Sequence, residues 1–139
     1  MRLDLILRVT AKVVIPFMIV FAFYVHFHGE FGPGGGFQAG VIITGTLALY
    51  TIVFGSYAAR KAFPPALAHA MAPAGVLIYA SAGLPALFLG KEFLNLNVFA
   101  GAQDLSQLIG IIWVEVGVIV TVAGAMISIF YALVDRGRP

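Results

Sequence analysis

The sequence contains no cysteine among its 139 residues, and only 10% of the residues are charged. The absence of cysteine excludes disulfides, iron–sulfur clusters and thiolate chemistry. The low charge is unlike a soluble domain, in which about a quarter of the residues are charged. Hydrophobic residues instead make up 61% of the chain, and its mean hydropathy is +1.02. These values predict an integral membrane protein, and a net charge of only +2 gives no indication of a nucleic-acid partner.

Long runs with almost no charge divide the chain into four candidate spans, at residues 5–27, 37–59, 66–89 and 105–134. A spanning helix needs about 20 apolar residues at 1.5 Å each. The runs do not alternate apolar and polar residues, as the strands of a membrane barrel do. The first span fits if Arg8 and Lys12 extend to the lipid headgroups. We therefore expect an all-α integral membrane protein with four transmembrane helices, forming a single domain over residues 1–139.

The basic residues are unevenly distributed between the two sides that four spans would create. The side with both termini and the second loop carries seven of the eight: Arg2, Arg8, Lys12, Arg60, Lys61, Arg136 and Arg138. Lys91 is the single basic residue on the other side. Loops rich in Lys and Arg stay in the cytoplasm. Both termini are therefore predicted to be cytoplasmic, and the first loop is predicted to face outward.

The first loop is rich in glycine and reads HFHGEFGPGGGFQAG from His26 to Gly40. A nucleotide-binding loop is excluded because no lysine follows Gly36 and because helices, not strands, flank the segment. Glycine permits positive φ and close backbone approach, and proline restricts φ. The segment therefore predicts a tight helix break between two spans. Its residues are Gly32, Pro33, Gly34, Gly35, Gly36, Phe37 and Gln38.

His26, His28 and Glu30 precede this helix break. One interpretation is that they are polar side chains at the outer membrane interface, where a helix ends. A second is a proton pathway, and a third is a metal site. The metal interpretation is the least favoured. The sequence shows no further groups that would hydrogen-bond and orient the ligands, and glycines interrupt the helix. We predict no metal and no cofactor.

Glu115 is the one charged residue in the interior of the fourth span. A charge in the middle of a membrane costs about 2.5–3.5 kcal/mol on insertion scales, so intramembrane carboxylates are candidates for a function. A direct role in ion or proton movement is one interpretation. The alternative is a protonated carboxyl group that makes a structural hydrogen bond.

The position of Glu115 around its helix leads to a further expectation. Small residues form a stripe along this span: Gly110, Gly117, Thr121, Gly124 and Ser128. At 100° per residue, Glu115 lies roughly opposite this stripe. If the stripe packs within the chain, Glu115 should face away from the chain, toward a partner subunit or a shared water-filled cavity.

The stretch from His28 to Gly40, HGEFGPGGGFQAG, resembles the signature of the MnhB-domain family, which supplies one of the small membrane subunits of the Mrp-type multisubunit cation/proton antiporters. Gly32 stands where serine is common in that family. The resemblance extends over nearly the whole chain. It implies a non-enzymatic accessory subunit of the bacterial cell (inner) membrane, surrounded by lipid and by other antiporter subunits, with Na⁺ and H⁺ as the transported ions. Pro33 and Phe37 match motif positions that are associated with function in the family.

On this interpretation the ion pathway uses Glu115, with His26, His28, Glu30 and Asp104 at its outer mouth. An alternative is a membrane-arm subunit of a membrane-bound hydrogenase or another complex I-related redox complex. A third possibility is a purely structural assembly subunit. One intramembrane carboxylate provides no relay, so partner subunits are required in each case.

Overall fold

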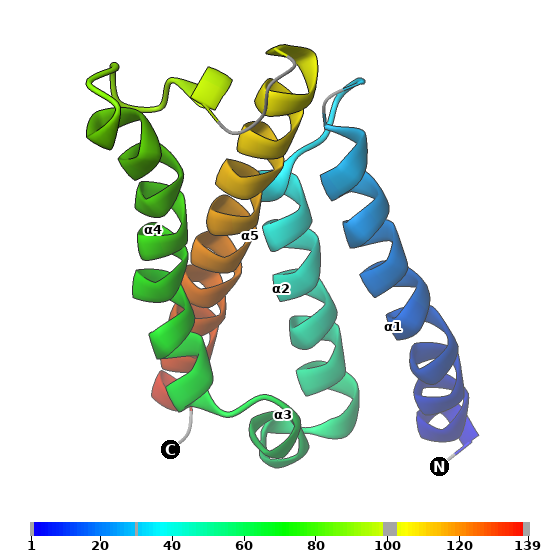
Figure 1. The fold of residues 1–139 in the computed structure, drawn as a ribbon. Coiled ribbons are helices and arrows are strands. Elements are labelled where there is room, and N and C mark those ends of the chain that lie inside the picture. The colour runs from blue at the N-terminus through cyan, green and yellow to red at the C-terminus, as the bar shows by residue number, and fades with distance from the viewer. Residues whose placement is uncertain (1, 30, 99–102, 138–139) are drawn as a thin grey trace.

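The computed structural model describes residues 2–29, 31–98 and 103–137, and almost all of them are helical (Figure 1). The helices are α1 (Arg2–His28), α2 (Gly36–Phe54), α3 (Ser56–Ala62), α4 (Pro65–Phe88) and α5 (Gln103–Arg136), with a short 3-10 helix, η1 (Leu96–Val98). Four of them are long and apolar enough to cross a membrane, namely α1, α2, α4 and α5. The described residues form no strand. The predicted all-α membrane fold with four spans is confirmed.

The second span is shorter than predicted, because its helix ends at Phe54 and not near Ala59. Gly55 follows with φ at 91°, a conformation that glycine adopts readily and other residues rarely do. The chain then forms α3, which carries Arg60 and Lys61 in its last turn. The break separates the basic residues from the apolar part of α2.

The four long helices run alongside one another, and α5 packs against both α4 and α2 (Figure 1). Helix α1 packs against α2 at the edge of the bundle. Both ends of the chain and α3 lie at one end of the molecule, and the α1–α2 connection lies at the other. This arrangement gives α5 two covered sides.

Small residues make the contact between α4 and α5. A Cβ added at Gly75 would lie 2.5 Å from the backbone nitrogen of Thr121, and one at Gly124 would lie 2.7 Å from that of Ala72. Such distances leave no room for a side chain, so the two backbones are in close contact. Membrane helices associate in this way because hydrocarbon offers no hydrophobic driving force between them. The small-residue stripe of α5 therefore packs within its own chain.

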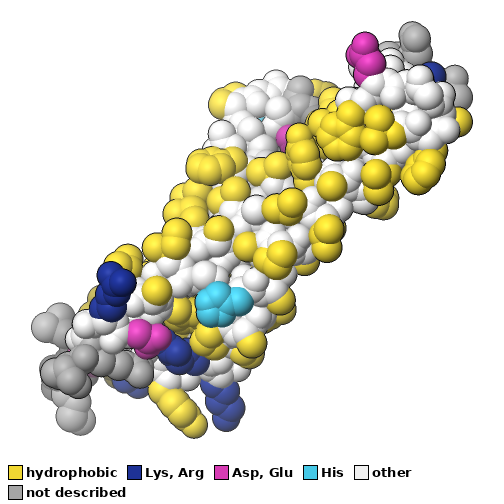
Figure 2. Space-filling view, turned by 90° about the vertical axis from the view of Figure 1, so that its left-hand side faces the viewer, with side chains coloured by type: hydrophobic (Ala, Val, Ile, Leu, Met, Phe, Trp, Pro, Cys, Tyr) yellow, Lys and Arg dark blue, Asp and Glu magenta, His cyan; other side chains and the backbone are white. Residues whose placement is uncertain are grey.

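Large apolar side chains lie mostly on the outside of the molecule. The buried hydrophobic residues are chiefly alanines, whereas Phe17, Val20 and Phe27 of α1 expose 70%, 65% and 61% of their surface. Figure 2 shows one face, on which hydrophobic side chains cover the middle and most charged side chains lie toward the two ends. This distribution is typical of a protein whose middle is surrounded by lipid or by other membrane helices.

Polar contacts join α3 to the end of α5. Arg60 forms an ion pair with Asp135, and its guanidinium lies 5.1 Å from the centre of the Tyr131 ring. The Tyr131 hydroxyl donates a hydrogen bond of 2.7 Å to the carbonyl of Phe63. These contacts hold the connection between α2 and α4 against the C-terminal end of the bundle.

Candidate functional site

The glycine-rich turn, which the structure describes at residues 29 and 31–35, folds back onto the end of α1. The amide of Gly35 donates a hydrogen bond of 3.1 Å to the carbonyl of Val25, and a Cβ at Gly34 would lie 2.5 Å from that same oxygen. Gly35 has φ 130° and ψ −178°, a region that is essentially restricted to glycine. The turn therefore donates a hydrogen bond to a carbonyl at the end of α1 that its own helix leaves without a donor. Helix α2 then begins directly beside the end of α1.

Helix α2 begins in direct contact with α5 at Glu115. A Cβ at Gly36 would lie 2.5 Å from the carbonyl oxygen of Glu115, and one at Gly29 would lie 3.0 Å from its Oε1. The carboxylate thus lies against the glycine-rich turn, beside the first residue of α2. The first amides of a helix have no partner within it and carry a partial positive charge, which favours an anion at this position.

His26 lies on the buried side of α1 and faces the carboxylate of Glu115. It follows Ala11 and Ala22 on one stripe of the helix, and only 3% of its surface is exposed. Its Nδ1 lies 3.8 Å from Oε2 of Glu115, whose side chain is 20% exposed. That distance is too long for a hydrogen bond. Within the described part of the chain, His26 Nδ1 has no hydrogen-bond partner.

The structure thus brings together a buried imidazole and a partly accessible carboxylate, from α1 and α5. These are among the side chains that most often accept and donate protons in proteins. A buried polar nitrogen without a hydrogen bond is costly, and such groups in native proteins are often functional. The arrangement is suited to holding a proton or a small cation between the two side chains.

The expectation that Glu115 faces away from its own chain is wrong. Glu115 does lie opposite the small-residue stripe, as 100° per residue requires, but that side of α5 is also covered. Helix α2 and the glycine-rich turn pack against it. The position of Glu115 around α5 is therefore as predicted. The error lies in the expectation that a partner subunit covers the side of α5 that carries Glu115.

Among the other predicted site residues, Gly35 and Gly36 lie against Glu115, and the Gln38 side chain also reaches Gly35. His28 is half-buried, and its ring stacks on Tyr24 with ring centres 5.2 Å apart. Pro33, Phe37 and Gln38 are exposed. Glu30 lies outside the described residues, as does the side chain of Asp104. The described residues contain no group of three or more His, Cys, Asp or Glu side chains that could hold a metal ion.

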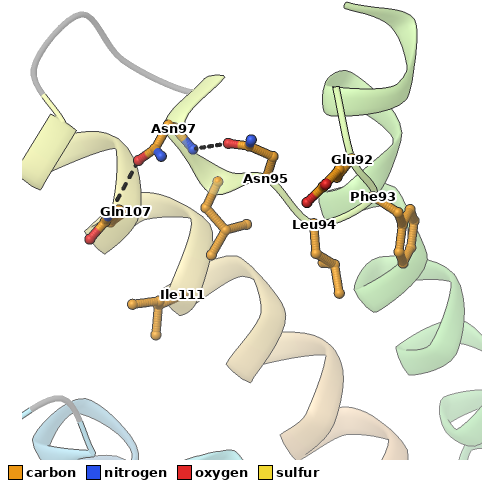
Figure 3. Close-up of a pocket in the computed structure, with 8 residues that line it drawn as sticks. Glu92, Phe93, Leu94, Asn95, Asn97, Gln107 and Ile111 are labelled. Atoms are coloured by element: carbon orange, nitrogen blue, oxygen red, sulfur yellow. Dashed lines mark hydrogen bonds between the residues drawn. The ribbon is translucent and has the colours of Figure 1, made fainter. Parts of the chain in front are cut away.

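A hollow of about 350 Å³ lies where the α4–α5 connection meets α5 (Figure 3). Polar side chains line part of it, but they pair with one another. Gln107 Nε2 donates to Asn97 Oδ1 at 3.1 Å, and the backbone N–H of Asn97 donates to Asn95 Oδ1 at 3.3 Å. Glu92 is its one acidic lining residue, and it is exposed. These bonds hold the loop onto α5, and we regard the His26–Glu115 pair as the better candidate site.

Sequence reasoning named both His26 and Glu115 but did not pair them. A signal is present, because His26 lies on the same side of α1 as Ala11 and Ala22, the two alanines of that helix. Small residues at helical spacing mark a packed side. A histidine on that side faces a neighbouring helix and not the membrane interface.

The contact at Gly36 provides a test with a matched control in the same helix. We predict that Gly36→Ala lowers the stability of the protein by about 1–3 kcal/mol, because the new methyl group pushes α2 away from the Glu115 backbone. Gly45→Ala should leave the stability unchanged or raise it, since no atom lies within 4 Å of the added Cβ. Thermal unfolding in detergent measures both. Equal melting temperatures for the two variants would contradict this packing.

Comparison with known proteins identifies the family. A family model described as a domain related to the MnhB subunit of Na⁺/H⁺ antiporters matches residues 6–128. A Staphylococcus haemolyticus protein provisionally named antiporter subunit mnhB2 is 31% identical over 133 residues, covering 94% of each chain. A Staphylococcus epidermidis protein with the same name is 28% identical over 133 residues and 94% of each chain. One from Staphylococcus aureus strain Newman is 31% identical over 129 residues, 86% of this chain and 91% of the relative.

The family match covers α2 and α4 completely and most of α1 and α5, including the glycine-rich turn and Glu115. The relatives align over nearly their full lengths, so the similarity is not confined to the glycine motif. This extent agrees with the resemblance that the sequence alone indicates. The chain belongs to the family of membrane proteins related to the MnhB subunit of Na⁺/H⁺ antiporters.

Proposed function

We propose that this chain is an accessory membrane subunit of a multisubunit Na⁺/H⁺ antiporter and that His26 and Glu115 form a proton-binding site in its ion pathway. The observation that carries the proposal is the 3.8 Å approach of a buried imidazole to a carboxylate. The names of the relatives support the antiporter assignment, and the chain matches 94% of the length of two of them. Those names do not favour a subunit of a redox complex. The chain contributes to a transporter and acts together with other subunits.

The two side chains differ in their access to water, which suits a proton-transfer step. Glu115 is partly exposed and receives a proton from the outer mouth of the pathway, whereas His26 is buried. A closing movement of about 1 Å brings Oε2 and Nδ1 to hydrogen-bond distance. Transfer of a proton from the neutral carboxyl to the neutral imidazole then leaves the total charge of the pair unchanged. The start of α2 stabilises the carboxylate that results.

This pair covers only a small part of the membrane. The hydrocarbon core is about 30 Å thick, so a site that spans a few ångströms needs further groups on either side. Other subunits of the complex supply those groups and the path for Na⁺. The chain contributes one step of the pathway and the helix surfaces on which its neighbours assemble.

We propose that the end of the molecule with both termini and α3 lies in the cytoplasm. Six basic residues belong to the helices that reach this end: Arg2, Arg8, Lys12, Arg60, Lys61 and Arg136. The glycine-rich turn and the His26–Glu115 pair then lie toward the outer surface of the cell membrane. In that orientation the carboxylate receives its proton from outside.

Substitution of the carboxylate tests the proposed site. In vesicles that contain the assembled complex, Glu115→Gln should reduce Na⁺-dependent proton transport about 100-fold or more, because the amide cannot bind and release a proton. Glu92→Gln, at an exposed carboxylate in the α4–α5 connection, should retain transport. Both variants should assemble normally, as judged by copurification of the other subunits. Normal transport by an assembled Glu115→Gln complex would leave the chain with a structural role only.

The orientation can be tested directly, because the chain contains no cysteine. Single cysteines introduced as Lys61→Cys and Lys91→Cys replace two exposed residues at opposite ends of the molecule. A membrane-impermeant maleimide should label Lys91→Cys in intact cells. It should label Lys61→Cys only after the membrane has been opened. The reverse labelling pattern would contradict the proposed orientation.

A further inference from the structure

A groove of about 400 Å³ separates the first half of α1 from the last turns of α2. Figure 1 shows α1 diverging from α2 toward the N-terminus. Side chains of both helices line the groove: Arg8, Lys12, Ile15, Pro16, Tyr50 and Phe54. It has two cations at one end and otherwise consists of apolar and aromatic side chains.

Arg8 and Lys12 lie one helical turn apart and are both exposed. Within the described part of the chain, neither forms an ion pair with a carboxylate. Asp4 lies one turn nearer the N-terminus and is not among the residues that line the groove. Two cations of the same chain therefore face the same opening, next to apolar surface. That arrangement is complementary to an anion attached to a hydrocarbon chain.

A second hollow of about 220 Å³ adjoins the groove. It shares Ile15 and Tyr50 with the first hollow. Its lining also includes Ile19, Ile43 and Ile127, together with Ala62 and Phe63 at the α3–α4 connection. Along α1 the order is Arg8, Lys12, Ile15 and Ile19, so charge gives way to apolar surface with increasing depth. Eleven residues separate Arg8 from Ile19, which is about 17 Å along the helix. One leaflet of hydrocarbon is about 15 Å thick.

We propose that this groove is a binding site for one anionic phospholipid of the surrounding membrane. Arg8 and Lys12 bind the phosphate. One acyl chain extends past Ile15 and Tyr50 into the apolar hollow lined by Ile19, Ile43 and Ile127. The helical rise from Arg8 to Ile19 is similar to the thickness of a leaflet, which favours a lipid over a soluble anion. Basic pockets between membrane helices bind anionic headgroups in this manner.

The same features disfavour a helix from another subunit as the occupant. A helix with its side chains is about 10 Å wide, and the inner hollow of about 220 Å³ holds only a few of its side chains. A partner helix would also need carboxylates opposite Arg8 and Lys12. A bilayer supplies the phosphate at that depth without any partner.

The test uses the full-length chain, purified in detergent, depleted of lipid and titrated with phosphatidylglycerol or zwitterionic phosphatidylcholine. Native mass spectrometry counts the bound lipid. The wild type should retain one phosphatidylglycerol in preference to phosphatidylcholine. The double variant Arg8→Gln/Lys12→Gln should bind phosphatidylglycerol about 30-fold more weakly, since each basic residue contributes about fivefold to the binding of an anionic lipid. Ile19→Trp, which fills the apolar part, should weaken the binding of both lipids.

The matched control is Lys61→Gln/Arg136→Gln, which removes two exposed cations at the same end of the molecule but outside the groove. It should keep the preference of the wild type. Equal binding of the two lipids by the wild type, or an equal loss in the control, would overturn the proposal. So would a double variant that keeps its lipid but loses another subunit from the assembled complex, because a protein helix would then occupy the groove.

Discussion

The close approach of α5 to the start of α2 determines where the carboxylate of Glu115 lies. At Gly36 the two helices touch backbone to backbone, and the Glu115 side chain then extends along the glycine-rich turn toward His26. A side chain at Gly36 would separate the helices, and one at Gly29 would occupy the space beside the carboxylate. The geometry of the proposed proton site thus depends on the absence of two side chains.

Helix α5 is held on two sides by the same physical means. Glycines and other small residues line its contact with α4, and glycines of α2 meet it on the other side at Glu115 and Val122. Within a membrane, packing of this kind replaces the hydrophobic effect as the force between helices. It also leaves the large apolar side chains on the surface, where lipid or other subunits surround them. Helix α1 has the fewest such contacts, and the proposed lipid groove lies beside it.

Much of the fold could be predicted from the sequence because hydropathy and length define spanning helices almost alone. The break at Gly55 was missed, since a single glycine within an apolar run is common in membrane helices. The side of α5 that carries Glu115 was predicted correctly from helical geometry. The segment that covers this side of α5 was not predicted, because the angle around a helix does not show which part of the chain packs there. His26 and Glu115 lie 89 positions apart in the sequence, and only the fold brings them together.

The proposed proton site requires that Glu115 faces His26 of its own chain beneath the glycine-rich turn. Its most direct test is crosslinking in the assembled complex, in a chain that has no cysteine of its own. A short bifunctional thiol reagent should link the pair His26→Cys/Glu115→Cys within one chain. It should not link His26→Cys/Trp113→Cys, because the Trp113 indole donates to the Ile78 carbonyl of α4 and so lies on another side of α5. A link from position 26 to position 113, or from position 115 to a different subunit in place of position 26, would contradict the account.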